Sequence, residues 1–134
     1  MSYPNRIFLI DDDEDDGFVF NEALNSLPHQ FELLYYQDSE QALARLSDNA
    51  FSPPDIMFID WNMPKLSGNH CLQSIRKLPG YDAVPIIIYS TSNHEQLQAE
   101  ARQLGASHFL AKPSTLKELV IKLEAILNKQ KGNN

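Results

Sequence analysis

The chain contains a single cysteine, Cys71, and no hydrophobic stretch long enough to cross a membrane. One cysteine cannot form an internal disulfide. The first residues, Met-Ser-Tyr-Pro-Asn-Arg, lack the apolar segment of a signal peptide. We therefore expect a cytoplasmic protein that does not associate with membranes.

Basic residues are also few, since 11 lysines and arginines stand against 18 aspartates and glutamates and give a net charge of -7. The lysines of the C-terminal region are spread along one segment rather than clustered on a face. Nucleic-acid binding requires a concentrated positive surface, so the sequence disfavours a nucleic-acid partner. Six acids fall together at residues 11–16, so the negative charge is a local feature.

A length of 134 residues and a hydrophobic content of 43% fit one compact domain with a real core. We predict a single domain over residues 1–134, with a core at about residues 6–127 and a polar tail at residues 128–134. There is no room for a second folded domain, and we expect the chain to act without an attached output domain.

The segment Ile56-Met57-Phe58-Ile59 is a run of four apolar residues that ends at Asp60. Such a run is typical of a strand buried on both faces of a sheet. Pro64 cannot donate a backbone hydrogen bond and restrains the residue before it, so a stiff loop follows Asp60. The strand therefore places Asp60 at a fixed point, either as a reactive carboxylate or as an aspartate that only caps a turn.

Strand-like and helix-like segments alternate along the whole chain. Strands are predicted at residues 7–10, 31–36, 56–60, 84–89 and 107–111, and each is followed by a segment with apolar residues at helical spacing. A capping box is expected at Ser92 and Glu95, and a second at Thr115 and Glu118. Five such units predict an α/β fold with a five-stranded parallel sheet covered on both faces, in the strand order 2-1-3-4-5.

Polar residues follow four of the five predicted strands. The first strand ends in Asp11-Asp12, the third in Asp60, the fourth in Ser90-Thr91 and the fifth in Lys112. In open parallel sheets, ligands bind beyond the carboxyl ends of the strands where the strand order reverses. We therefore expect these side chains to converge on one site.

Several carboxylates in one crevice repel one another and require a cation nearby. Lys112 is one candidate, and a divalent ion held by oxygen ligands, such as Mg²⁺, is the other. The absence of a histidine pair or a cysteine in the set disfavours zinc. A carboxylate nucleophile, a metal ion, an ammonium group and a hydroxyl are together what phosphoryl transfer to an aspartate requires. The chain has no glycine-rich phosphate loop, so the donor is not expected to be a nucleotide bound by this chain.

These residues, in this order, resemble a response regulator receiver domain of the flavodoxin-like fold. The resemblance rests on Asp11-Asp12, on Asp-Trp-Asn-Met-Pro at residues 60–64, and on Gly68, Ser90 and Lys112-Pro113. It extends from about Arg6 to Leu127. It implies phosphorylation of Asp60 by a histidine kinase or phosphotransfer protein, and binding of downstream proteins through the fourth helix, fifth strand and fifth helix.

The resemblance also implies a role for each site residue. Asp12, Asp60 and the backbone carbonyl of Asn62 would ligate Mg²⁺, and Asp11 would act on the ion through water. Ser90, Thr91 and Lys112 would contact the phosphoryl group, while Ser90 and Phe109 would switch conformation together. The Lys112-Pro113 bond would be cis. Thr91 is larger than the residue often found there, and Ser92 lacks a charge or an amide that could position the hydrolytic water. Both departures concern the turnover of the phosphorylated form.

Three other functions compete with that of a stand-alone phosphorylated switch. A relay protein would pass the phosphoryl group onward to a histidine, and the sequence does not distinguish this role from a switch. A phosphatase with an aspartyl nucleophile would usually have a second acid two residues later, where this chain has Asn62. A module that binds partners without phosphorylation would not need the complete site. We expect no enzymatic activity beyond self-phosphorylation and autodephosphorylation at Asp60.

Overall fold

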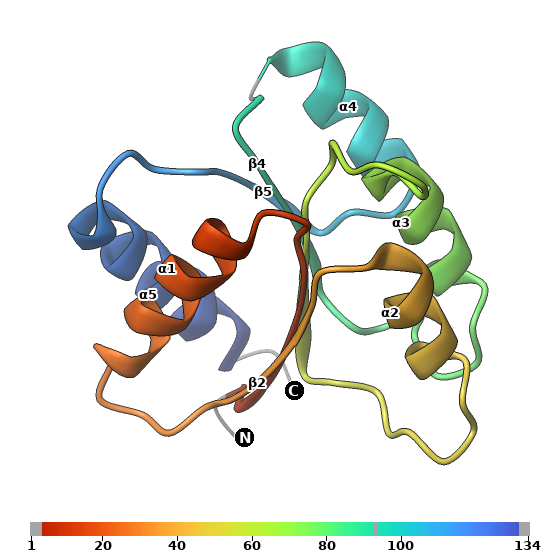
Figure 1. Ribbon diagram of the computed structural model, residues 1–134, viewed down its shortest axis with the longest axis horizontal. Helices are drawn as coiled ribbons and strands as arrows, with labels where there is room; N and C mark the ends of the chain where they lie inside the picture. Colours follow the sequence, from red (N-terminus) through yellow and green to blue (C-terminus); the bar gives the residue numbers. More distant parts are fainter. Residues whose placement is uncertain (1–3, 93, 132–134) are drawn as a thin grey trace.

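The computed structural model describes residues 4–92 and 94–131. Within them, five strands alternate with five helices along the chain (Figure 1). The strands are β1 (Arg6–Ile10), β2 (Glu32–Tyr36), β3 (Ile56–Ile59), β4 (Ile86–Ser90) and β5 (His108–Ala111). The helices are α1 (Glu14–Asn25), α2 (Ser39–Leu46), α3 (Gly68–Arg76), α4 (Glu95–Gln103) and α5 (Leu116–Lys131).

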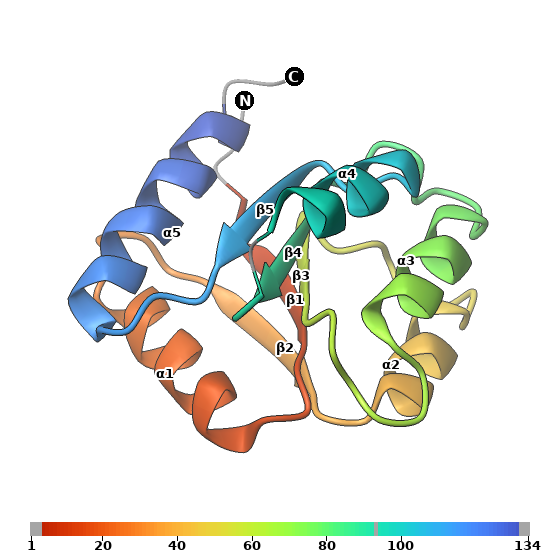
Figure 2. The same ribbon diagram turned by 90° about the horizontal axis from the view of Figure 1, so that it is seen from above.

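All five strands are parallel and form one sheet in the order β2-β1-β3-β4-β5. Viewed from above, α1 and α5 lie on one side of the sheet, and α2, α3 and α4 lie on the other (Figure 2). The predicted α/β class, strand order and two-sided cover are confirmed. The order reverses between β1 and β3, the point at which such sheets bind ligands.

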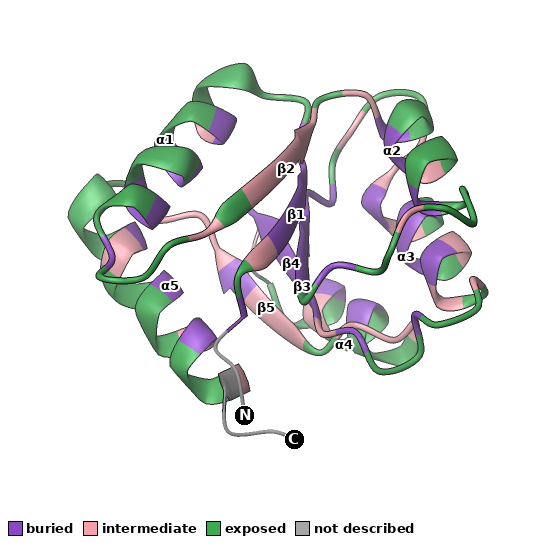
Figure 3. Ribbon diagram, turned by 90° about the horizontal axis from the view of Figure 1, so that it is seen from below, coloured by how far each residue is buried: buried purple, intermediate pink, exposed green. Residues whose placement is uncertain are grey.

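Alternation along the central strands divides the core into two clusters. Phe8 and Ile10 of β1 face the cluster under α2, α3 and α4, whereas Ile7 and Leu9 face the cluster under α1 and α5. β1 and β3 are buried on both faces (Figure 3). A strand of this kind cannot slip by one residue without moving each side chain into the opposite cluster, so the register of the residues that follow it is fixed.

The predicted starts of β1, β2 and β5 differ from the structure by one residue, and two other starts differ by more. β4 begins at Ile86 rather than residue 84, because Pro85 has no N–H to donate to the ladder. α4 has His94 as its N-cap, without a side-chain hydrogen bond, so the expected capping box of Ser92 and Glu95 is absent. The N–H of Ser92 instead donates to Ser90 Oγ at 3.2 Å, which keeps Ser92 in the turn after β4.

The last helix has one of the two hydrogen bonds of the expected capping box, and it is longer than expected. The Glu118 N–H donates to Thr115 Oγ1 at 3.1 Å. The polar tail predicted from residue 128 is wrong for residues 128–131, which continue α5, and residues 132–134 lie outside the described residues. Gln130 Nε2 lies 3.3 Å from His108 Nε2, so the last helical turn contacts β5.

The Lys112–Pro113 bond is trans, since no peptide bond of the described residues is cis, and the expected cis form is wrong. The trans isomer is the intrinsically preferred form of a bond before proline.

In the described part of the chain, no helix is both long and apolar enough to cross a membrane.

Candidate functional site

The two central strands bring two aspartates side by side. Ile10 is paired with Ile59, and each is the last residue of its strand. Asp11 and Asp60 therefore leave the sheet next to each other, and the Asp60 N–H donates to the Ile10 carbonyl at 2.9 Å. The backbone of both residues is held by the sheet, so their carboxylates are placed with little freedom.

Asp11, Asp12 and Asp60 form an acidic cluster in which one carboxylate oxygen from each lies within 4.8 Å of the others. Asp11 is fully buried, Asp60 is 6% exposed, and Asp12 is exposed to solvent. The cluster therefore reaches solvent mainly through Asp12. A donor set of carboxylate oxygens in this arrangement can hold a metal ion and suits a hard divalent cation.

Lys112 provides the positive charge at this edge. The backbone N–H of Lys112 donates to the Ser90 carbonyl at 2.8 Å, which continues the pairing of β5 with β4. The side chain passes over the Tyr89 ring, with Nζ 5.1 Å from the ring centroid, and is 8% exposed. Nζ lies 2.9 Å from Asp11 Oδ2 and 3.6 Å from Asp60 Oδ2.

The electrostatics of the cluster reflect this burial. Removal from water raises the pKa of Asp60 to about 7. Lys112 acts against that rise, and the charge of Asp11 adds to it. Burial also raises the pKa of Asp11. Burial alone would lower the pKa of Lys112, but its contacts with Asp16 and Asp11 raise it further than burial lowers it.

One lysine does not satisfy all of the acidic oxygens. Asp11 Oδ2 is buried and has no hydrogen bond of suitable geometry within the described residues, although the ammonium lies 2.9 Å away. The ion pair with Lys112 offsets only part of the cost of burying this carboxylate. The residues therefore fit an additional cation.

The hydroxyl side of the site comes from β4 and the loop after it. Ser90 is fully buried, and its Oγ accepts the hydrogen bond from the Ser92 N–H, so its own proton remains available to donate elsewhere. Thr91 is exposed beside it. Asn62 follows Asp60 by two residues, and its side chain donates to Ser92 Oγ at 3.5 Å. The structure thus brings the predicted β4 residues and the loop after Asp60 to the same edge.

Phe109 is placed elsewhere. It pairs with Ile88 in the sheet, is half-buried, and packs against the cluster under α2, α3 and α4. It also lines a cavity of about 410 Å³ with residues of α4 and α5, among them Gln98 and Ile126. Phe109 is therefore separate from the acidic cluster, on the surface that the sequence assigned to partner binding.

Asp16 is a site residue that the sequence did not reveal. Its place in the first turn of α1 is explained by the helix dipole, but its Oδ2 lies 2.7 Å from Lys112 Nζ. One signal was available. Asp16 precedes the buried Phe20 by four residues and so lies on the helix face that turns toward the sheet.

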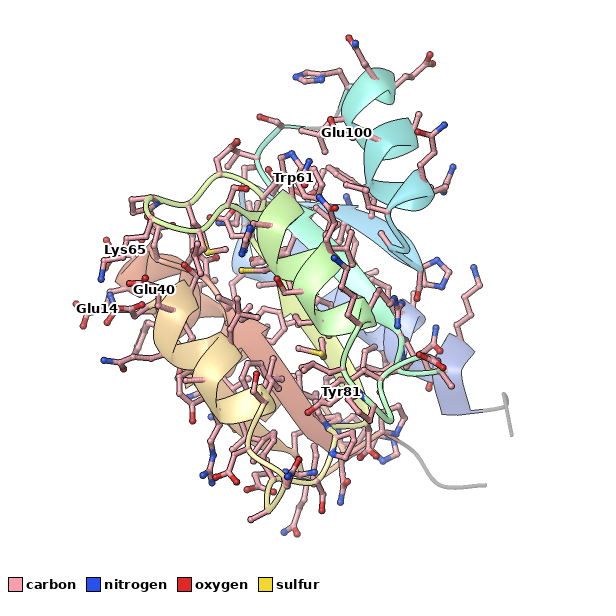
Figure 4. All side chains as sticks on the ribbon, turned by 90° about the vertical axis from the view of Figure 1, so that its right-hand side faces the viewer. Glu14, Glu40, Trp61, Lys65, Tyr81 and Glu100 are labelled. Atoms are coloured by element: carbon pink, nitrogen blue, oxygen red, sulfur yellow. The ribbon has the colours of Figure 1, made fainter. Side chains whose placement is uncertain are left out.

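The loop after Asp60 is held by contacts that were also not predicted. Lys65 adopts a positive φ of 63°, which is uncommon for a residue with a side chain. Its ammonium lies 2.9 Å from Asp38 Oδ2, at the N-cap of α2. It also lies 3.6 Å from Glu40 Oε1 in the first turn of that helix, and Figure 4 shows Lys65 and Glu40 next to each other. Lys65 and Asp38 line one cavity of about 270 Å³ together with Asp12. The loop that carries Asn62 is thereby tied to α2.

Known proteins with similar sequences and folds agree with the family resemblance of the site residues. A family model described as the response regulator receiver domain matches residues 7–124. The chain is 33% identical over 125 residues to the transcriptional regulatory protein CpxR of Klebsiella pneumoniae, covering 93% of this chain and 50% of the relative. It is 28% identical to a probable chemotaxis protein CheY of Rhizobium etli, covering 90% and 91%, and 28% identical to the response regulator Rcp1 of Synechocystis, covering 92% and 86%. The chain thus spans about half of the first relative and most of the other two.

Two solved structures resemble this fold. The Mn²⁺-bound form of Rcp1 has a TM-score of 0.83 at 24% identity and covers 98% of this chain and 97% of its own. The phosphorylated cyanobacterial phytochrome response regulator RcpA has a TM-score of 0.81 at 27% identity, covering 92% and 91%. The likeness to Rcp1 supports the fold alone, since the two sequences are 24% identical. The likeness to RcpA combines a similar fold with a sequence that is 27% identical.

Proposed function

The chain belongs to the response regulator receiver domain family of two-component signal transduction, and from this premise we propose that it accepts a phosphoryl group on Asp60. The observation that carries the proposal is the environment of Asp60. Its carboxylate is 6% exposed, lies next to Asp11 and Asp12, and has the Lys112 ammonium 3.6 Å away. Such a carboxylate is held in place, and the cation beside it can stabilise the negative charge of a phosphoryl group.

The donor would be a phosphohistidine on a histidine kinase or a phosphotransfer protein. An ionised oxygen of Asp60 attacks the phosphorus, an O–P bond forms, and the N–P bond of the phosphohistidine breaks. The electron pair of that bond stays on the imidazole nitrogen, which takes up a proton. Because Lys112 favours the ionised form of Asp60, it supports the nucleophile before transfer.

The chain's own groups would then hold the transferred group. Lys112 would contact one phosphoryl oxygen, and the buried Ser90 hydroxyl would donate a hydrogen bond to a second. The exposed Thr91 would border the entrance to the site. Asp60 would be both the acceptor and the site of autodephosphorylation. On this proposal, the chain has no enzymatic activity on other substrates.

Mg²⁺ would be the resident ion. The acidic cluster and the unsatisfied Asp11 Oδ2 fit a hard divalent cation, and Asp12, Asp60 and the backbone carbonyl of Asn62 would hold it, with Asp11 acting through water. The bound ion would neutralise phosphoryl oxygens.

The chain would act as a stand-alone cytoplasmic switch whose downstream protein binds the face of α4, β5 and α5. The half-buried Phe109 and the cavity of about 410 Å³ on that face support this assignment. The extensive coverage of the CheY and Rcp1 relatives supports the stand-alone role. In a relay, the phosphoryl group would instead pass from Asp60 to a histidine, and incubation of the phosphorylated chain with a phosphotransfer protein would separate the two roles.

Trp61, the only tryptophan, reports on the site because it follows Asp60 directly and is 8% exposed. Mg²⁺ and then beryllofluoride, which mimics a phosphoryl group, are titrated while Trp61 fluorescence and the heat of binding are recorded. We expect two saturable changes, with the second lost in Asp60→Asn. Absence of both fluorescence and heat changes in the wild-type chain would contradict the proposal.

A further inference from the structure

The Lys112 ammonium divides its contacts unequally among three carboxylates. Nζ lies 2.7 Å from Asp16 Oδ2, 2.9 Å from Asp11 Oδ2 and 3.6 Å from Asp60 Oδ2. Only the contact with Asp16 has both the length and the geometry of a charge-assisted hydrogen bond within the described residues. In this state, Lys112 is bonded to α1 rather than to the phosphoacceptor.

The fold of α1 does not require the carboxylate of Asp16. Asp13 is the N-cap, and its side chain accepts hydrogen bonds from the N–H groups of Asp15 and Asp16. Asp15 and Asp16 both lie in the first turn and interact with the same helix dipole. Of these two, Asp16 is the one that reaches Lys112, a residue 96 positions further along the chain.

Asp16 is also the partner that Lys112 can release at the lowest cost. Its side chain is 35% exposed, whereas the side chain of Asp11 is completely buried. If the ammonium moves away, water can solvate the partly exposed carboxylate of Asp16, but the carboxylate of Asp11 would remain as an unpaired buried charge.

We propose that Asp16 is a positioning residue that holds Lys112 in the resting state and thereby slows phosphorylation of Asp60. This inference rests on the proposed function, because it concerns how readily Lys112 becomes available to the phosphoryl group. An incoming phosphoryl group competes with Asp16 for the same ammonium, and the negative charge of Asp16 repels it as well. Both effects act in the same direction.

The test compares three variants with the wild-type chain. Asp16→Asn removes the charge at nearly constant shape, Asp16→Glu keeps the charge, and Asp15→Asn is the matched control because it removes one exposed charge from the same helical turn. Each is assayed for its rate of phosphorylation by acetyl phosphate with saturating Mg²⁺, and for its affinity for beryllofluoride. Thermal unfolding of each variant verifies that it is folded.

We expect Asp16→Asn to be phosphorylated about threefold faster or more, the size expected for a partly exposed ion pair, and to bind beryllofluoride more tightly. Asp16→Glu should return toward the wild-type rate, and Asp15→Asn should stay close to it. A folded Asp16→Asn that is phosphorylated at the wild-type rate or more slowly would overturn the inference. Equal acceleration in Asp15→Asn would do so too, because the effect would then be one of general charge. A wild-type chain that takes up no phosphate would instead contradict the proposed function.

Discussion

Gly68 lies directly against the backbone of Asp60. A β-carbon at Gly68 would lie 2.5 Å from the carbonyl oxygen of Asp60 and 2.6 Å from the Cα of Trp61, and the Gly68 N–H already donates to the Trp61 carbonyl at 2.9 Å. The start of α3 is therefore packed against the backbone of Asp60 and Trp61 with no room for a side chain. This contact fixes where the loop of residues 61–67 returns to the sheet.

Gly68→Ala should destabilise the protein by about 2–4 kcal/mol, because the atoms that would have to move belong to the backbone. Chemical denaturation measures this change. Gly17→Ala is the comparison, since its β-carbon would meet the far end of the Tyr35 side chain rather than backbone atoms, and moving that side chain costs the hydrogen bond from its hydroxyl to the Asp11 carbonyl. A smaller loss of stability in Gly68→Ala than in Gly17→Ala would show that the loop is not held as described.

Asp60 should reduce the stability of the metal-free protein at neutral and higher pH. Its pKa is raised from 3.8 to about 7 on folding, mainly by burial, so between these values the folded state holds the proton and the unfolded state does not. The free energy of unfolding therefore decreases as pH rises through this range. Asp60→Asn should be more stable than wild type by about 2 kcal/mol near pH 8, with the difference disappearing below about pH 4. Denaturation with chelator present across this pH range measures it, and a gain that is independent of pH would contradict this explanation.

Asp12→Ala should raise the melting temperature of the metal-free protein and weaken Mg²⁺ binding. The substitution removes one carboxylate from the repulsive cluster, but Asp12 is exposed, so the rise should be small, about 1–3 °C. Calorimetry with and without Mg²⁺ checks both parts. A lower melting temperature without the metal would mean that Asp12 has a stabilising partner in the folded state.

Arg76 should be important for stability although it lies outside the site. Its guanidinium donates to the carbonyls of Gly105 at 3.0 and 2.7 Å, Tyr81 at 2.7 Å and Val84 at 2.8 Å. These bonds join the end of α3 to the turns before β4 and β5. Arg76→Met leaves the carbonyls unsatisfied and should cost about 3 kcal/mol. The exposed neighbour provides the control, since Lys77→Met also removes one positive charge but should change the free energy of unfolding by less than about 0.5 kcal/mol.

The sheet and the positions of Asp11, Asp60 and Lys112 could be predicted because each depends on a strong local signal. A run of apolar residues marks a buried strand, and the residue that follows it must lie at the edge of the sheet. Because the strands are parallel, their carboxyl ends all lie at the same edge of the sheet, and the strand order then gives the neighbours. No side-chain packing had to be known.

The remaining features depend on competition between local and distant contacts. For Asp16, the helix dipole already accounted for an acid in that turn, and the spacing of four residues from the buried Phe20 was the further signal for a contact toward the sheet. Ser92 and Glu95 have the spacing of a capping box, but the hydroxyl of Ser90 holds the N–H of Ser92 and the helix starts later. The positive φ of Lys65 likewise has no signature in its residue type. It occurs where ion pairs with Asp38 and Glu40 tie the loop to α2.

The most direct test of the central claim is the intact mass of the protein after incubation with acetyl phosphate and Mg²⁺. In this reaction, an O–P bond forms to Asp60, the O–P bond of acetyl phosphate breaks, and acetate leaves. We predict that the wild-type chain gains the mass of one phosphoryl group, that a chelator suppresses the gain, and that Asp60→Asn shows none. A folded wild-type chain that gains no mass, or a gain that persists in Asp60→Asn, would contradict the assignment of Asp60 as the phosphoacceptor.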